Sequence, residues 1–304
     1  MLFAFKKSTW LSIATCLGVI VPISNGGEIP IVSGAQPKLL ETGFKFTEGP
    51  VADSAGNVYF TDQPNDRIMK WTVGDNSFST FMQPAGRANG LEFDGKDHLI
   101  ACADEKGQLL SINVNTKAVE VLLDRFQGKL FNGPNDVWIR KDGSMFFTDP
   151  FYKRDYWQDR DQPEQAAQRV YYLAKGAKEP VIAEETLVQP NGIVGSPDGA
   201  TLFVADIGAQ KTYRYRIAPD GKLTDRILFC EMGSDGMALD TMGNLYLTGK
   251  GVSVFDKDGK QLGEIPIDKP WTANVTFAGK DMKTLFITAS DAVYSLEMTV
   301  PGCR

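Results

Sequence analysis

Histidine is nearly absent from this sequence: its 304 residues include one, His98. A Ser-His-Asp or Cys-His hydrolase needs a histidine base beside its nucleophile. His98 follows the turn glycine Gly95 and opens an apolar run, which places it beside a turn between strands. We expect it at the surface, so the sequence excludes histidine-based nucleophilic catalysis.

Cysteine and clustered positive charge are also scarce. The four cysteines match no zinc-binding spacing, and three of them, Cys102, Cys230 and Cys303, lie beyond the N-terminal apolar run. Three cysteines permit at most one internal disulfide, and Cys102 and Cys230 lie in apolar runs typical of buried thiols. The net charge is −6 with a pI near 5.0. Nucleic acid is therefore not expected as a partner, because its binding depends on clustered Lys and Arg.

The long apolar run of the chain covers residues 10–23. It is shorter than the roughly 20 residues of a membrane span. Lys6 and Lys7 precede it, and small residues at 24–26 follow it. This arrangement predicts a signal peptide over residues 1–26, removed to leave a periplasmic or secreted protein without a stable membrane span. An uncleaved N-terminal anchor is the alternative.

A short pattern of two apolar strands around a glycine turn occurs six times in residues 27–304. The turn glycines are separated by 39, 48, 56, 44 and 36 residues, and they are Gly56, Gly95, Gly143, Gly199, Gly243 and Gly279. Repeats of this length with several short strands are typical of propeller blades. The sixth repeat lacks a fourth strand, and residues 37–42 resemble the fourth strands of other repeats. We therefore predict one all-β domain, a six-bladed β-propeller closed by an N-terminal strand that completes the last blade.

One polar side chain precedes the turn of every repeat at nearly the same place. These residues are Glu48, Asn89, Asn135, Asn191, Asp235 and Asn274. In a propeller, six equivalent positions converge on one axis. Glu48, Asn135, Asn191 and Asp235 offer two carboxylates and two amide oxygens, a set that suits Ca²⁺, or Mg²⁺ and Mn²⁺ with more water retained. Spacing alone leaves a second interpretation open, in which these groups hold waters in the axial channel.

Four motifs resemble the SMP-30/gluconolactonase/luciferin-regenerating-enzyme family. They are FTEGP at 46–50, NGPND at 132–136, PNG at 190–192 and SDGMALD at 234–240. FTDP at 147–150, followed by Tyr152, resembles the bacterial gluconolactonase branch. The resemblance runs from about residue 40 to the end. It implies a six-bladed propeller with one divalent cation at its axis, Ca²⁺ first, with Mg²⁺, Mn²⁺ or Zn²⁺ as alternatives.

The resemblance also implies roles for individual residues. Glu48, Asn191 and Asp235 are expected as metal ligands, Asn135 as a ligand or substrate contact, and Asp235 also as the general base. Senescence-marker-type members carry an arginine two residues before the Asn135 position, where this chain has Gly133. Arg87, two residues before Asn89, or an arginine of the loop after Asp149 is the candidate replacement.

The longest loop expected at the mouth of the channel runs from Asp149 to about Gln168. It is rich in aromatic and basic residues, and long loops in compact domains are often functional. We expect this loop to act as a lid, with Tyr152 and Trp157 joining Arg87, Asn89 and Asn135 as substrate contacts. A surface insertion that caps its own blade is the alternative.

The resemblance, together with the chemistry of these residues, implies a metal-dependent hydrolase that opens sugar lactones or similar cyclic esters. The cation would polarise the lactone carbonyl, and Asp235 would assist the attack of water. Two other functions remain open on the sequence alone. The same site could hydrolyse aryl esters or phosphotriesters, or the protein could be a non-enzymatic propeller that binds a small molecule or a protein and uses calcium structurally.

Overall fold

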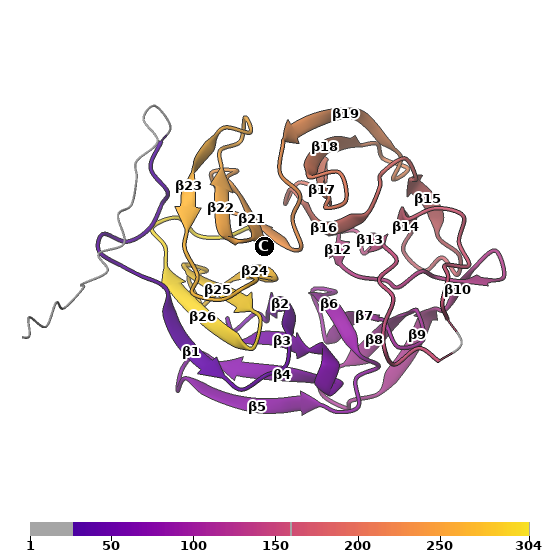
Figure 1. Ribbon diagram of the computed structural model, residues 1–304, viewed down its shortest axis with the longest axis horizontal. Coiled ribbons are helices and arrows are strands. Elements are labelled where there is room, and N and C mark those ends of the chain that lie inside the picture. Colours follow the sequence, from indigo (N-terminus) through magenta and orange to yellow (C-terminus); the bar gives the residue numbers. More distant parts are fainter. Residues whose placement is uncertain (1–26, 159, 304) are drawn as a thin grey trace, which may run out of the picture.

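Six four-stranded antiparallel sheets surround a central axis in the computed structural model, which describes residues 27–158 and 160–303 (Figure 1). Each sheet is one blade, and its first strand lies nearest the axis. This confirms the predicted six-bladed β-propeller.

The strands of blades 1 to 5 follow the chain order. Blade 1 comprises β2 (Thr47–Ala52), β3 (Val58–Asp62), β4 (Arg67–Thr72) and β5 (Ser77–Met82). Blade 2 comprises β6 (Ala88–Phe93), β7 (His98–Ala103), β8 (Gln108–Asn113) and β9 (Val119–Leu123). Blade 3 comprises β12 (Val137–Ile139), β13 (Met145–Asp149), β14 (Arg169–Leu173) and β15 (Val181–Glu184).

The second half of the ring repeats this plan. Blade 4 comprises β16 (Pro190–Gly195), β17 (Thr201–Asp206), β18 (Lys211–Ile217) and β19 (Leu223–Cys230). Blade 5 comprises β20 (Met237–Leu239), β21 (Leu245–Gly249), β22 (Gly251–Phe255) and β23 (Gln261–Ile265). Two small elements were not anticipated: the 3₁₀ turn η1 (Gln63–Asn65) and a hairpin of β10 (Arg125–Phe126) and β11 (Lys129–Leu130).

Blade 6 is built from both ends of the chain. Its strands β24 (Asn274–Ala278), β25 (Thr284–Ala289) and β26 (Ala292–Glu297) are completed by β1 (Lys38–Thr42). β1 pairs antiparallel with β26, from Lys38 opposite Ser295 to Thr42 opposite Ala292. Figure 1 shows β1 beside β26 at the outside of the ring. This pairing confirms the predicted closure and covers an edge that would otherwise expose unpaired backbone groups.

The six turn glycines explain why the repeat is visible in the sequence. All six lie in the left-handed region, with φ between 73° and 87°. L-residues with a side chain rarely adopt this conformation, so the turn between the first two strands of each blade favours glycine. At Gly56 space is also restricted, since a Cβ would lie 2.3 Å from the carbonyl carbon of Gly279 in blade 6.

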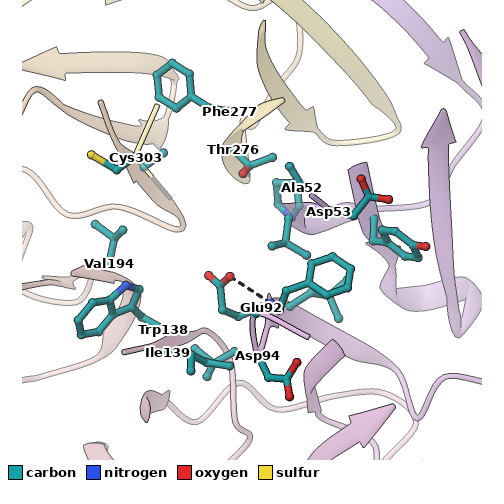
Figure 2. Close-up of a pocket in the computed structure, with 18 of the residues that line it drawn as sticks. Ala52, Asp53, Glu92, Asp94, Trp138, Ile139, Val194, Thr276, Phe277 and Cys303 are labelled. Carbon is teal, nitrogen blue, oxygen red and sulfur yellow. Dashed lines mark hydrogen bonds between the residues drawn. The ribbon is translucent and has the colours of Figure 1, made fainter. Parts of the chain in front are cut away.

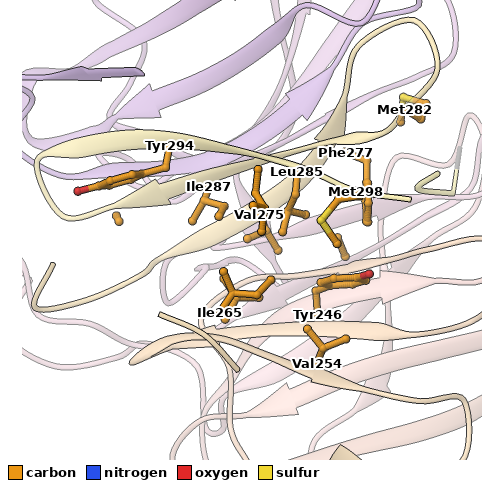
Figure 3. Close-up of a cluster of buried hydrophobic side chains, with 14 of the residues drawn as sticks. Tyr246, Val254, Ile265, Val275, Phe277, Met282, Leu285, Ile287, Tyr294 and Met298 are labelled. Atoms are coloured by element: carbon orange, nitrogen blue, oxygen red, sulfur yellow. The ribbon is translucent and has the colours of Figure 1, made fainter. Parts of the chain in front are cut away.

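The core lies between neighbouring blades. Figure 3 shows the cluster where blade 5 packs on blade 6, with Val254 and Ile265 facing Val275 and Ile287. The ring of Tyr246 meets that of Phe277 edge to face at 5.2 Å. Successive side chains of a strand point to opposite faces of the blade. Apolar and aromatic residues are therefore buried against both neighbouring blades, and this burial holds adjacent blades together.

The axial channel widens at the turn-glycine end into a cavity of about 820 Å³. Figure 2 shows Glu92 projecting into this cavity among Trp138, Val194 and Phe277. Its Oε1 accepts a hydrogen bond from the backbone N–H of Phe93 at 3.1 Å. Burial raises the pKa of Glu92 from an ordinary value of 4.5 to about 8; the negative charge of Asp136 adds to this shift, and the Phe93 N–H opposes it.

Glu92 is expected to make the fold less stable as the pH rises from about 4.5 to about 8. In this window the unfolded chain has lost the proton that the folded protein still holds, so stability falls by up to about 1.4 kcal/mol per pH unit. We expect Glu92→Gln to remove the Glu92 contribution to this slope and to be more stable than the natural protein at pH 9; Asp136 and Asp149, whose pKa values burial raises to about 7, keep their own contributions. Denaturant unfolding between pH 4 and pH 9 measures it, with the exposed Glu120→Gln as control. Parallel stability profiles for the natural protein and Glu92→Gln would contradict the assignment.

The predicted signal peptide, residues 1–26, lies outside the described residues and stays a prediction. Among those that are described, no helix is long and apolar enough to cross a membrane. Cys102, Cys230 and Cys303 are free thiols.

Candidate functional site

The polar residues of the inner strands meet at the opposite end of the channel from Glu92. They surround a pocket of about 230 Å³. Its lining comprises Phe46, Glu48, Gln63, Asn89, Asn135, Tyr152, Arg154, Ile207, Asp235 and Trp271. Blades 1 to 4, the links after blades 4 and 5, and the segment before β2 thus contribute to one concave site.

Irregular backbone turns these side chains towards the axis. The pairing of the inner strand shifts register after Glu48 in β2, between Ala88 and Leu91 in β6 and between Pro190 and Ile193 in β16. In blades 3 and 5, regular pairing begins only two residues after Asn135 and Asp235. Such bulges re-aim a side chain that a regular strand would point at a neighbouring blade.

Threonines of the second strands hold this irregular backbone in place. Thr148 Oγ1 accepts the N–H of Asp136 at 3.1 Å, and Thr248 Oγ1 accepts the N–H of Gly236 at 2.8 Å. Both donors come directly after a polar residue of the site. The hydroxyls therefore satisfy backbone groups that the interrupted ladder leaves unpaired.

Two carboxylates, Glu48 and Asp235, lie together in the pocket. Glu48 is 2% exposed, and its Oε2 accepts the N–H of Gly49 at 2.7 Å and Asn274 Nδ2 at 3.2 Å. Asp235 Oδ1 accepts Asn191 Nδ2 at 2.8 Å, and its Oδ2 accepts Trp271 Nε1 at 2.6 Å. Each carboxylate is thus held by two donors on different parts of the chain.

The electrostatics of the pair favour a bound cation. Burial raises the pKa of Glu48 well above its usual value, and the nearby charge of Asp235 raises it further. Burial also raises the pKa of Asp235, opposed by its hydrogen bonds from Trp271 and Asn191. The Arg154 guanidinium at the pocket lowers the pKa of Asp235. The two carboxylates repel each other in a buried site, so a second positive charge would further favour ionisation of both.

Asn191 supplies an independent observation on cation binding. Its Nδ2 donates to Tyr152 Oη at 2.9 Å and to Asp235, whereas its buried Oδ1 has no hydrogen-bond partner. An unpaired buried acceptor beside a carboxylate is a suitable ligand for a hard cation. No cluster of three or more His, Cys, Asp or Glu that could hold a metal occurs in residues 27–158 and 160–303. A cation here would therefore need amide oxygens besides the two carboxylates, and the residues present fit that requirement.

The structure brings most of the predicted site residues together. Glu48, Asn89, Asn135, Tyr152 and Asp235 line the pocket, and Asn191 is bonded to two of them.

Two predicted substrate contacts lie elsewhere. Arg87 stacks on the ring of Tyr156 at 4.2 Å and donates to the carbonyl of Pro64 at 3.0 Å. Trp157 is buried, and its Nε1 donates to the carbonyls of Asp104 and Glu105 at 3.3 and 3.1 Å. Neither residue is part of the pocket lining.

Five lining residues were not singled out from the sequence: the apolar Phe46 and Ile207, and three with hydrogen-bonding side chains, Gln63, Trp271 and, among the arginines of the long loop, Arg154. Trp271 lies three residues before Asn274, in the link between blades 5 and 6, and this proximity to a polar position was an available signal. Gln63 is the first residue of η1, directly after Asp62, and no sequence pattern marked it as a site residue.

The loop between β13 and β14 reaches from blade 3 across to blade 2. Arg154, Tyr156 and Trp157 all bond to Asp104. Further along, Arg160 donates to the carbonyls of Phe131 and Asn132. The loop is therefore tied down beside the pocket, with Tyr152 and Arg154 facing it.

His98 lies away from this site. Its Nδ1 is 3.6 Å from Asp94 Oδ2, and its side chain is 42% exposed. Asp94 lines the cavity at the opposite end of the channel. The surface position expected for His98 is confirmed, and the described residues offer the pocket no histidine base.

Comparison with known proteins identifies the fold family. The family model described as the SMP-30/gluconolactonase/LRE-like region matches residues 46–291. The chain belongs to this family. It is 30% identical over 285 residues to a gluconolactonase of Zymomonas mobilis, covering 84% of this chain and 79% of the relative.

Solved structures agree with this assignment. A gluconolactonase from Xanthomonas campestris is 28% identical with a TM-score of 0.82, covering 92% of this chain and 98% of that one. The calcium-binding protein regucalcin from Agrobacterium tumefaciens shares the fold with a TM-score of 0.75 at 19% identity, covering 92% and 98% of the two chains.

Proposed function

We propose that this family member is a divalent-cation-dependent hydrolase that opens sugar lactones, as its relatives named gluconolactonases do. The observation that carries the proposal is the pair of carboxylates, Glu48 and Asp235, beside the unpaired Oδ1 of Asn191 in a concave pocket. A purely structural axis needs no acidic pair at its open mouth.

Glu48, Asn135, Asn191 and Asp235 would hold the cation. Their carboxylate and amide oxygens suit Ca²⁺ first, and also Mg²⁺ or Mn²⁺. When bound, such an ion polarises a carbonyl group and stabilises negative charge that develops on its oxygen. Zn²⁺ fits this set less well because nitrogen and sulfur ligands are missing.

Asp235 would move the proton. A water attacks the lactone carbonyl carbon and gives a proton to the Asp235 carboxylate. The bond from that carbon to the ring oxygen then breaks, and Asp235 returns the proton to the ring oxygen, leaving a hydroxy acid. Hydrogen bonds from Trp271 and Asn191 fix the orientation of Asp235 for both transfers.

The other lining groups would orient the substrate. Asn89 offers an amide at the pocket wall, and Tyr152 packs beside Asn191 on the loop side. The anchored loop between β13 and β14 would limit the access of bulk water, which would strengthen the electrostatic interactions inside the pocket.

Chelation tests this proposal. We expect EDTA to lower the hydrolysis of glucono-, galactono- or xylono-lactone by about 100-fold or more, because the polarising charge is removed. Added Ca²⁺, Mg²⁺ or Mn²⁺ should restore the rate. A pH-stat measures turnover, and far-UV circular dichroism verifies that the fold survives. An aryl ester serves as the alternative substrate.

Two outcomes would contradict the proposal. One is the absence of acceleration above the spontaneous rate with any of these cations. The other is unfolding on chelation, which would assign the cation a structural role.

We also propose that the mature protein begins after residue 26 and acts in the periplasm or outside the cell. Intact-mass measurement of the protein purified from its native host tests this.

A further inference from the structure

An aspartate lies at the end of the second strand in four blades, and three of the four share one role. Each of these three carboxylates accepts two backbone N–H groups from the segment that leads into the inner strand. The pairs are Lys45 and Phe46 on Asp62, Asn132 and Gly133 on Asp149, and Val188 and Gln189 on Asp206. The distances lie between 2.8 and 3.3 Å.

Asp104 of blade 2 differs from them. Its Oδ2 accepts Arg154 Nε at 2.5 Å, Tyr156 Oη at 2.8 Å and Gln63 Nε2 at 3.2 Å. The Asp104 side chain is 3% exposed. A buried carboxylate with three side-chain donors is a rigid anchor, and two of the donors belong to the loop of another blade.

The position of Gly133 explains why this anchor can exist. A Cβ at residue 133 would lie 2.6 Å from Asp104 Oδ1, which is closer than such atoms approach. Any side chain at 133 would therefore displace Asp104. In this chain the absence of a side chain at 133 leaves that space to Asp104.

Arg154 lines the pocket and keeps two donor groups that Asp104 does not engage. Its Nε is engaged by Asp104, and its guanidinium lies 5.3 Å from the centre of the Tyr152 ring. Its two Nη groups make no hydrogen bond with the described residues, and the side chain is 23% exposed. Among the residues that line the pocket, it is the basic one. A guanidinium fixed through Nε presents a rigid pair of donors to oxygen acceptors.

We propose that Arg154, held by Asp104, recognises the ring hydroxyls of the substrate and makes the enzyme selective for polyhydroxylated lactones. Arg154 contacts the substrate, and Asp104 is a positioning residue that acts through it. The inference rests on the proposed lactonase function, but its contacts do not involve the cation.

A pair of lactones tests the selectivity. Glucono-δ-lactone carries ring hydroxyls, and δ-valerolactone has the same ring and ester without them. We expect Arg154→Met to lower kcat/KM for glucono-δ-lactone by about 10- to 100-fold, mainly through KM, the range expected for lost hydrogen bonds to a charged group. Turnover of δ-valerolactone should fall much less, so that the ratio of kcat/KM for the two lactones changes by about 10-fold or more. Arg154→Lys should restore little, because lysine keeps the charge and loses the paired donors.

Asp104→Asn tests the positioning role. Like Arg154→Met, it should raise KM for glucono-δ-lactone. Its effect should nearly vanish in an Arg154→Met background, because Asp104 and Arg154 act as one unit. Arg216→Met, an exposed arginine of β18, is the control, and melting curves verify that each variant folds. Equal losses on both lactones, or additive effects of the two substitutions, would overturn the inference.

Failure of the proposed function can be told apart from failure of this inference. If the natural protein hydrolyses neither lactone, calorimetric binding of 1,5-anhydroglucitol, which has the hydroxyls but no ester, takes the place of turnover. Binding that Arg154→Met abolishes would sustain the recognition role, and binding that is absent or unchanged would reject it.

Discussion

Asp235→Asn is expected to lower kcat for lactone hydrolysis by about 10³-fold, the largest effect of any single substitution in the pocket. Asparagine keeps the size of the side chain but cannot take up the proton of the attacking water. It also replaces an oxygen that accepts from Asn191 or Trp271 with an NH₂ group, which puts two donors face to face. The rate in a pH-stat at saturating lactone measures the loss.

The loss has to be separated from weaker cation binding. Calcium titration calorimetry on Asp235→Asn gives the cation affinity, and turnover is then measured at saturating Ca²⁺. The matched control is Asp220→Asn, which changes an exposed aspartate in the turn between β18 and β19. Full recovery of turnover at high Ca²⁺ would restrict Asp235 to a ligand role and contradict its assignment as the base.

Removal of β1 is expected to have the largest effect on stability. A chain that starts at Gly43 leaves β26 as an open edge and exposes part of the blade 6 surface, where the partly buried Leu40 packs. We expect a loss of several kcal/mol, a lower melting temperature and aggregation through the exposed edge. Differential scanning calorimetry and size-exclusion chromatography measure these properties.

A second truncation provides the control. A chain that starts at residue 37 keeps β1 but lacks the preceding segment, in which Ile29 and Ile31 pack against the core of blades 5 and 6. The difference between the two truncated chains isolates the contribution of the closing strand. Equal stability of both would show that β1 is not what closes the ring.

Much of the fold could be predicted because its signals are local. Gly56 and the five equivalent glycines mark turns with a backbone conformation that favours glycine. Each blade can therefore be recognised in the sequence from the few residues around its turn. Within a blade, each strand pairs with the strand that precedes or follows it in the sequence. The closing strand could be inferred because the sixth repeat lacks a fourth strand of its own. The hairpin of β10 and β11 was missed because two-residue strands have no periodicity to detect.

The site residues that could be predicted are likewise those that the repeat marks. Glu48, Asn135 and Asp235 occupy equivalent places in a repeat, so the symmetry of the ring brings them to one axis, and the pocket contains all three. Arg87 and Trp157 were selected for chemical type and nearness in sequence. In the structure their polar groups bond to other parts of the protein, which turns both away from the pocket lining.

The number of blades, the closure of the ring and the polar residues that face the axis could all be predicted from the amino-acid sequence, because each depends on a repeated local pattern. That Arg154 and Trp271 complete the pocket and that Asp104 anchors the loop became visible in the folded protein alone. Those contacts join residues of different blades, such as Asp104 and Arg154, 50 positions apart. They depend on how irregular loops fold against one another, for which no repeat in the sequence provides a pattern.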